Sequence, residues 1–166
     1  MNTDFHIHSS FSSDSEASME SMIEAGIRLG LTAMCFTEHL DYDYVPGEPD
    51  FIVDTPAYLD CLRRCRDLYG SRIELLFGIE LGLQPHLTRR LNDYISQWDF
   101  DFVIGSSHLV HGADPYYPAF YEGRKEEDCY LEYFETIIEN LNAFSDIDVY
   151  GHIDYVVRYG PNKNRF

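Results

Sequence analysis

The sequence lacks the features that mark membrane and secreted proteins. No apolar run of roughly 18 residues occurs anywhere in the chain, so a transmembrane helix is not expected. The N-terminus, MNTDFHIHSS, has neither the basic segment nor the apolar segment of a secretory signal peptide. We therefore expect a cytoplasmic protein that does not associate with membranes.

Basic residues are scarce. The chain has 12 Lys and Arg against 29 Asp and Glu, which gives a formal net charge of −17. Such a balance repels nucleic acid and anionic membranes, so neither is an expected partner. A small anionic substrate remains compatible with this charge if metal ions or an arginine reverse its sign locally.

Cysteine is also sparse, and its spacing matches no common cysteine motif. No CxxC pair occurs, so we expect reduced, mostly structural thiols in a reducing compartment. Cys61 and Cys65 are four residues apart in a predicted helix, so they can share one face. The four cysteines are Cys35, Cys61, Cys65 and Cys129.

Hydrophobic residues, by contrast, make up 45% of the 166 residues, enough for the core of one domain over residues 1–166. Short apolar runs alternate with longer helical patterns, which favours βαβ units and a parallel α/β sheet. We expect strands near 4–8, 32–37, 73–80, 102–107 and 148–153, with helices near 17–30, 55–69, 86–97 and 126–143.

Each predicted strand ends in histidine or glutamate. His6 and His8 face the same way, because side chains alternate along a strand. The carboxyl ends of parallel strands meet at one edge, so these residues are expected to converge. Glu38 points to the opposite face from its neighbour and is expected to be structural. The converging residues are His6, His8, His39, Glu80, His108 and His152.

Converging imidazole and carboxylate groups suit Zn, Mn or Fe, and the absence of converging cysteines disfavours a closed structural zinc site. The ligands outnumber the four of a single zinc ion, so two or more divalent ions are expected. Two neighbouring ions can activate water and hold both oxygens of a phosphoryl displacement. A hydrolytic site is therefore favoured over a structural one.

The same motifs resemble the PHP (polymerase and histidinol phosphatase) superfamily. His6-x-His8, Thr-Glu-His at 37–39, Glu80, Ser-Ser-His at 106–108 and Gly-His at 151–152 occur in the order of that superfamily. The segments FTEH, GIELG, GSSHLV and YGHIDYVVRYGP are similar to its histidinol-phosphatase branch, and the resemblance covers nearly the whole chain.

The resemblance implies a distorted (β/α)7 barrel with up to three metal ions. It implies that His6, His8 and Glu80 hold a first ion, and that Glu80 bridges to a second ion held by His108 and His152. Asp14 and His39 would hold a third ion. The implied reaction is hydrolysis of L-histidinol phosphate to L-histidinol and phosphate, with Glu80, His108 and His152 as the catalytic residues.

The resemblance also implies two further strands after the Gly-His segment, followed by an Asp-x-His pair. No Asp-x-His follows position 152 in this sequence. We therefore expect a barrel truncated after about five βα units, which is a fragment, a truncated gene product or a form completed by another chain. Weak or no activity is expected, together with poor solubility or a homo-oligomer formed through open barrel edges.

Two residues outside the ligand set are candidate substrate contacts. Arg158 offers a guanidinium fork to a phosphate group, and the resemblance points to an arginine here. His111 lies in a loop three residues after His108. Lys163 and Arg165 are further cations near the end. The long aromatic loop 109–123 either covers the substrate or is an ordered surface loop.

Two other functions remain open. One is a metal-dependent phosphoesterase of different specificity, acting on nucleotides or on oligonucleotide ends, although the acidic charge disfavours DNA. The other is a catalytically inactive metal-binding domain.

Overall fold

The computed structural model describes residues 2–45 and 51–162, so Lys163 and Arg165 lie outside the described residues. Five of its strands form one sheet in the order β1-β2-β4-β5-β6, and all neighbours in this order are parallel. The parallel α/β class predicted from the sequence is confirmed. The strands are β1 (Thr3–Ile7), β2 (Ala33–Asp41), β4 (Glu74–Gly82), β5 (Phe102–Ser106) and β6 (Val149–Tyr150).

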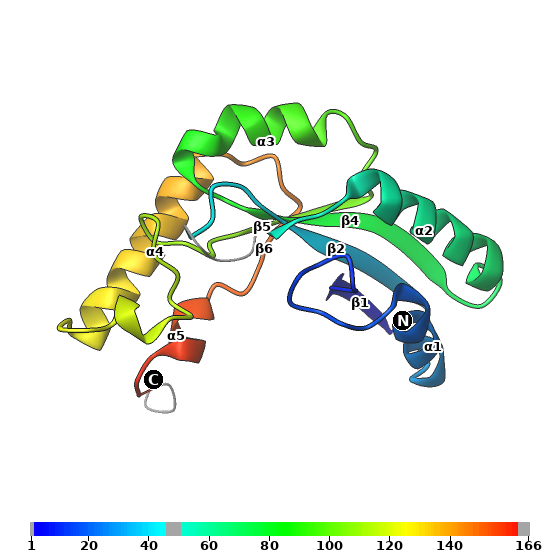
Figure 1. The fold of residues 1–166 in the computed structure, drawn as a ribbon, viewed down its shortest axis with the longest axis horizontal. Helices are drawn as coiled ribbons and strands as arrows, with labels where there is room; N and C mark the ends of the chain where they lie inside the picture. Colours follow the sequence, from blue (N-terminus) through cyan, green and yellow to red (C-terminus); the bar gives the residue numbers. More distant parts are fainter. Residues whose placement is uncertain (1, 46–50, 163–166) are drawn as a thin grey trace.

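Helices cover the outer side of this sheet, and the whole forms a curled half-barrel. Figure 1 shows the strands as an arch, with the longer helices along its outside and the two termini toward opposite ends. None of the helices in the described part of the chain combines the length and the apolar character that a membrane crossing needs. The helices are α1 (Met19–Arg28), α2 (Thr55–Tyr69), α3 (Thr88–Ile95), α4 (Glu126–Ala143) and α5 (Tyr155–Tyr159), with short 3-10 turns at Pro85–Leu87 and Pro118–Phe120.

The predicted elements differ from the observed ones mainly at the strand ends. β2 and β4 run further than expected, so His39 lies within a strand rather than after it, and Glu80 lies two residues before the end of its strand. The short strand β3 (Phe51–Ile52) was not predicted, and its antiparallel pairing with Leu40 and Asp41 extends the ladder at the end of β2. The last expected strand is reduced to Val149–Tyr150, which pairs only with β5 in the described chain.

The two faces of the sheet carry different side chains, because successive residues of a strand point to opposite faces. On β4, every second residue packs into the main core against α2 residues such as Tyr58 and Leu62, while Glu80 faces the concave side. On β2, Phe36 and Leu40 share the core face with Glu38. The core residues of β4 are Leu75, Phe77, Ile79 and Leu81.

Strands β1 and β6 are the outermost strands of the described sheet. An edge strand presents backbone donors and acceptors that another strand can pair with. The homo-oligomer expected from the sequence stays a prediction, which light scattering of the purified chain can test.

Candidate metal centre

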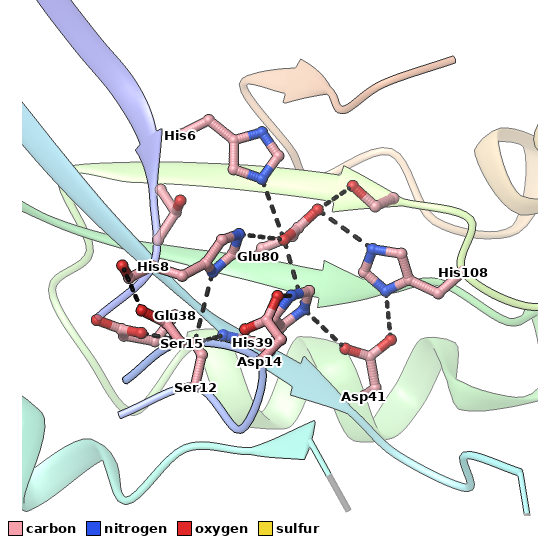
Figure 2. A network of polar contacts seen from close by, with 12 residues as sticks. His6, His8, Ser12, Asp14, Ser15, Glu38, His39, Asp41, Glu80 and His108 are labelled. Carbon is pink, nitrogen blue, oxygen red and sulfur yellow. Dashed lines mark hydrogen bonds and ion pairs between the residues drawn. The ribbon is translucent and has the colours of Figure 1, made fainter. Parts of the chain in front are cut away.

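The sheet register places the first pair of candidate ligands side by side. His39 on β2 is directly opposite Glu80 on β4, so both side chains project from the same face. His6 lies near the end of β1, and His8 follows that strand directly. His108 and His152 each follow their strands by two residues. Figure 2 shows most of these side chains converging around Glu80.

Glu80 is the centre of the cluster. Its side chain is fully buried, and both of its carboxylate oxygens face histidine nitrogens. Oε2 lies 3.1 Å from His6 Nε2, 3.2 Å from His8 Nε2 and 3.4 Å from His39 Nδ1. Oε1 lies 2.9 Å from His152 Nε2 and 3.3 Å from His108 Nε2.

The polar atoms of this cluster are not all satisfied by the protein. Glu80 Oε2 lies within 3.2 Å of two histidine nitrogens, yet within the described residues it accepts no hydrogen bond. His152 Nδ1 is buried and likewise has no hydrogen-bond partner there. Buried polar atoms are rarely left without a partner, and a bound ion is one explanation for such an exception.

The donor set fits divalent metal ions. The cluster divides into overlapping groups of three residues whose ligand atoms all lie within 4.8 Å of one another. Every donor is an imidazole nitrogen or a carboxylate oxygen, which are ligands that Zn, Mn and Fe accept. The groups are His6–His8–Glu80, His8–Asp14–His39, His39–Asp41–His108 and Glu80–His108–His152.

Charges within the cluster are strongly coupled. Burial acts to raise the pKa of Glu80, but the charge of His108 and hydrogen bonds from His108 and His152 on the Oε1 side outweigh it and hold that pKa well below the usual range. Burial acts to lower the pKa of His39, yet Asp14, Asp41 and Glu80 together raise it to about 9. The carboxylates of the cluster therefore favour the protonated forms of His39 and His108.

Asp14 takes part in this cluster from the loop after β1. Its Oδ2 lies 3.4 Å from His39 Nε2, and its side chain is 45% exposed. All seven residues that the sequence suggested as metal ligands thus line one cleft of about 640 Å³.

Asp41 is a member of the site that the sequence analysis missed. Its Oδ1 lies 2.5 Å from His108 Nδ1, and its Oδ2 lies 3.2 Å from His39 Nδ1. A carboxylate bound to the far ring nitrogen of a ligand histidine fixes the orientation and tautomer of the ring. The available signal was its position two residues after His39, which puts both on the same face of a strand.

The other side of the cleft is aromatic. Asp114, from the loop 109–123, is nearly buried and accepts hydrogen bonds from Tyr44 Oη, from Tyr155 Oη at 3.0 Å and from Tyr116 N at 2.7 Å. Arg158 on α5 also lines the cleft. The long loop therefore contributes to the site rather than lying elsewhere on the surface.

The structure does not bring His111 to the cleft, so its expected contact with substrate needs correction. Its side chain is 60% exposed and lies 3.1 Å from Glu132 and 3.6 Å from Glu139, both on α4. Its backbone has a φ of 49°, a left-handed conformation that turns the chain just after His108. Proximity in sequence to a ligand was a misleading signal here.

Glu38 faces away from the cluster, as expected, and holds the loop that follows β1. It accepts hydrogen bonds from Ser9 N at 3.1 Å, from Ser9 Oγ at 2.6 Å and from Ser12 Oγ at 2.5 Å. This loop carries Asp14 toward His39. Ser9 and Ser12 therefore tie the loop to the carboxylate of Glu38, on the face of β2 opposite the metal cluster.

Glu38→Gln is expected to lower the free energy of unfolding by about 2 kcal/mol, because the amide group cannot accept all of the hydrogen bonds that the buried carboxylate accepts. Urea denaturation measures this change. Glu74→Gln, at the exposed start of β4, is the matched control. Equal stability of the two variants would show that the Ser9–Glu38–Ser12 contacts contribute nothing to the fold.

Together, the parallel α/β half-barrel and the histidine–carboxylate cluster at its carboxyl edge define a protein with a candidate metal centre in an open cleft. The sequence profile of the PHP domain matches residues 4–165. The chain belongs to the PHP domain family.

Histidinol-phosphatases are among its relatives. The histidinol-phosphatase of Lactococcus lactis is 35% identical over 163 residues, covering 98% of this chain and 60% of the relative. A probable histidinol-phosphatase of Clostridium acetobutylicum is 32% identical, covering 94% of this chain and 58% of the relative. The chain thus spans about three fifths of the length of these relatives.

A solved structure has the same architecture. The crystal structure of histidinol phosphate phosphatase from Lactococcus lactis, complexed with zinc, L-histidinol and phosphate, superposes with a TM-score of 0.92 at 34% identity. The match covers 96% of this chain and 60% of that one. A putative histidinol phosphatase from Listeria monocytogenes, at 19% identity and a TM-score of 0.77, shares the fold.

Proposed function

We propose that this chain is a metal-dependent phosphomonoesterase that hydrolyses L-histidinol phosphate. The observation that carries the proposal is the convergence of five histidine rings on the buried carboxylate of Glu80. The similarity to a histidinol phosphate phosphatase whose crystal structure contains zinc, L-histidinol and phosphate supports the choice of substrate.

The residue groups suit two or three divalent ions, which are Zn, Mn or Fe by the chemistry of the donors. His6, His8 and Glu80 would hold one, Glu80 with His108 and His152 a second, and Asp14 with His39 a third. When bound, such ions supply the Lewis acidity that activates water and polarises a phosphoryl group.

The remaining cleft residues bind and orient the substrate. Arg158 is the arginine that lines the cleft in the described chain, and its guanidinium can take two phosphoryl oxygens in a bidentate contact. The organic part of L-histidinol phosphate carries an ammonium group and an imidazole. Tyrosine rings around Asp114 offer faces that attract such cations. Asp41 keeps the rings of His39 and His108 turned toward the cleft.

The test is phosphate release from L-histidinol phosphate by the chain loaded with Zn or Mn, measured at a chain concentration high enough to detect the weak activity expected when no Asp-x-His pair follows position 152. His108→Ala is expected to abolish release, because it removes a buried ring that faces both Glu80 and Asp41. His86→Ala is the matched control, since His86 is 58% exposed and pairs with Asp43 outside the cleft. It is expected to keep the wild-type rate.

A substrate panel separates the proposal from its alternatives. Faster hydrolysis of nucleoside monophosphates or of a phosphodiester than of L-histidinol phosphate would assign a different specificity. Bound metal without turnover of any phosphate ester would contradict the proposal and leave an inactive metal-binding domain. An unchanged rate in His108→Ala would remove this histidine from the site.

A further inference from the structure

A second group of metal-ligating side chains lies in the helical layer, away from the cleft. Glu20 on α1 and Cys61 and Cys65 on α2 place one ligand atom each within 4.8 Å of the others. None of the three lines the cleft described above. Figure 1 shows α1 and α2 beside each other at the N-terminal end of the arch.

Local structure explains this convergence. Cys61 and Cys65 are one helical turn apart, so their thiols share the face of α2 that packs on the core. Glu20 lies in the first turn of α1 and approaches from the neighbouring helix. Both cysteines are buried, at 7% and 0% exposure, whereas Glu20 is half-buried and gives the group its access to solvent.

The chemistry of this group differs from that of the cleft. Two sulfur atoms and one carboxylate suit a thiophilic cation, whereas the cleft offers only nitrogen and oxygen. In a tetrahedral zinc site with Zn–S bonds of about 2.3 Å, the ligand atoms are ~3.8 Å apart. The observed spacing reaches that geometry by small rotations of side chains, and a water molecule can complete the fourth position.

The thiol of Cys65 is a poor nucleophile. Burial, the neighbouring Cys61 and the charge of Glu20 raise the pKa of Cys65 to about 12. The thiol of Cys65 is therefore protonated at neutral pH, and an ion that binds it releases that proton to solvent.

We propose that Glu20, Cys61 and Cys65 bind one thiophilic divalent cation, such as Zn²⁺ or Cd²⁺, that joins α1 to α2. The site is independent of the cleft and of the activity proposed for it. It adds a link between the two helices that cover the β1–β2–β4 side of the sheet.

The test uses Cd²⁺ added to the whole, metal-free chain under reducing conditions. Cadmium bound to thiolate gives an ultraviolet charge-transfer band, which histidine and carboxylate ligands do not give. Wild type and the Glu80→Gln variant are both expected to show the band once the added Cd²⁺ exceeds what the cleft binds, because Glu80 belongs to the cleft alone. A band in Glu80→Gln reports on the cysteine site even if the cleft has no phosphatase activity. The inference and the proposed function can therefore fail separately.

Three variants locate the ion. Cys61→Ser, which nearly preserves volume, is expected to lose the band. Glu20→Gln is expected to weaken Cd²⁺ binding by more than about tenfold, because loss of a ligand costs at least as much as loss of an orienting partner. Cys129→Ser replaces a buried cysteine that belongs to none of the metal-ligating groups of the described chain, and it is expected to keep the band. No band in wild type, or a band that persists in Cys61→Ser, would overturn the proposal.

A second measurement uses only the wild-type chain, so it tests the site even if a cysteine variant fails to fold. In the wild-type chain, Cd²⁺ is expected to protect Cys61 and Cys65 from alkylation after partial opening in mild denaturant, as read by mass spectrometry of peptides. Cys35 and Cys129 serve as internal references in the same sample. Equal labelling of all four cysteines with and without Cd²⁺ would contradict the site.

Discussion

Replacing Glu80 with Gln is expected to lower the affinity of the cleft for Zn or Mn by more than ~100-fold and to abolish phosphate release. Glu80 is the residue that faces all five histidines, and its two oxygens belong to two different ligand groups. Removal of an orienting partner outside the ligand set already costs about 10- to 100-fold in affinity. Loss of a shared charged ligand should cost more.

The substitution also changes the balance of charge. Glutamine keeps the shape of the side chain and can still accept from Ser106 Oγ, which donates to Oε1 at 2.6 Å. It removes the negative charge that stabilises the protonated rings, so the metal-free variant is left with histidines facing a neutral amide. A defect in metal binding with little change in the folded structure is therefore the expected outcome.

Two measurements test this prediction. Equilibrium dialysis with metal analysis gives the affinity, and circular dichroism checks the fold. The matched control is Glu74→Gln, on the same strand but exposed at its other end. Wild-type metal content in Glu80→Gln would contradict the central role of this carboxylate.

Much of the site could be predicted because strand geometry is regular. Alternation along β1 put His6 and His8 on one side, and parallel pairing put the ends of separate strands at one edge. The same alternation predicted correctly that Glu38 faces away from the cluster. These inferences needed only the period of a strand and the fact that βαβ units run parallel.

The other features of the site depend on strand lengths, backbone turns and tertiary contacts, which the alternation of side chains along a strand does not specify. Asp41 was missed because β2 was expected to end at Thr37, which left this residue in a loop. His111 was misplaced because a left-handed turn of the backbone carries it out toward α4. Asp114 meets Tyr44 and Tyr155 across more than 40 positions of sequence, so only tertiary structure reveals their contact.

Asp41→Asn is expected to weaken metal binding by about 10- to 100-fold without removing any proposed ligand. Asp41 is nearly buried and accepts from His108 with one oxygen and from His39 with the other. An asparagine offers one oxygen and one NH₂ group, so it can accept from only one ring. The other ring must change its tautomer or turn away from the cleft.

The backbone around Asp41 is shaped to hold it in place. A Cβ atom on Gly82, the last residue of β4, would collide with Asp41 Oδ1. Glycine is therefore required where β4 passes this carboxylate, and Gly82→Ala should move Asp41 and reproduce part of the Asn phenotype. Because Gly82→Ala leaves the Asp41 carboxylate intact, weaker metal binding in that variant would arise from displaced His39 and His108 rings rather than from a chemical change at Asp41.

The experiment separates a positioning role from a purely structural one. Metal titration is expected to show weaker binding in Asp41→Asn, and saturating metal should recover much of the phosphate release that is lost at limiting metal. Asp43→Asn is the matched control, because Asp43 is 55% exposed, lies outside the cleft and has a φ of 51° that asparagine tolerates. If Asp41→Asn binds metal as tightly as Asp43→Asn, the contacts of Asp41 with His39 and His108 do not orient the ligands.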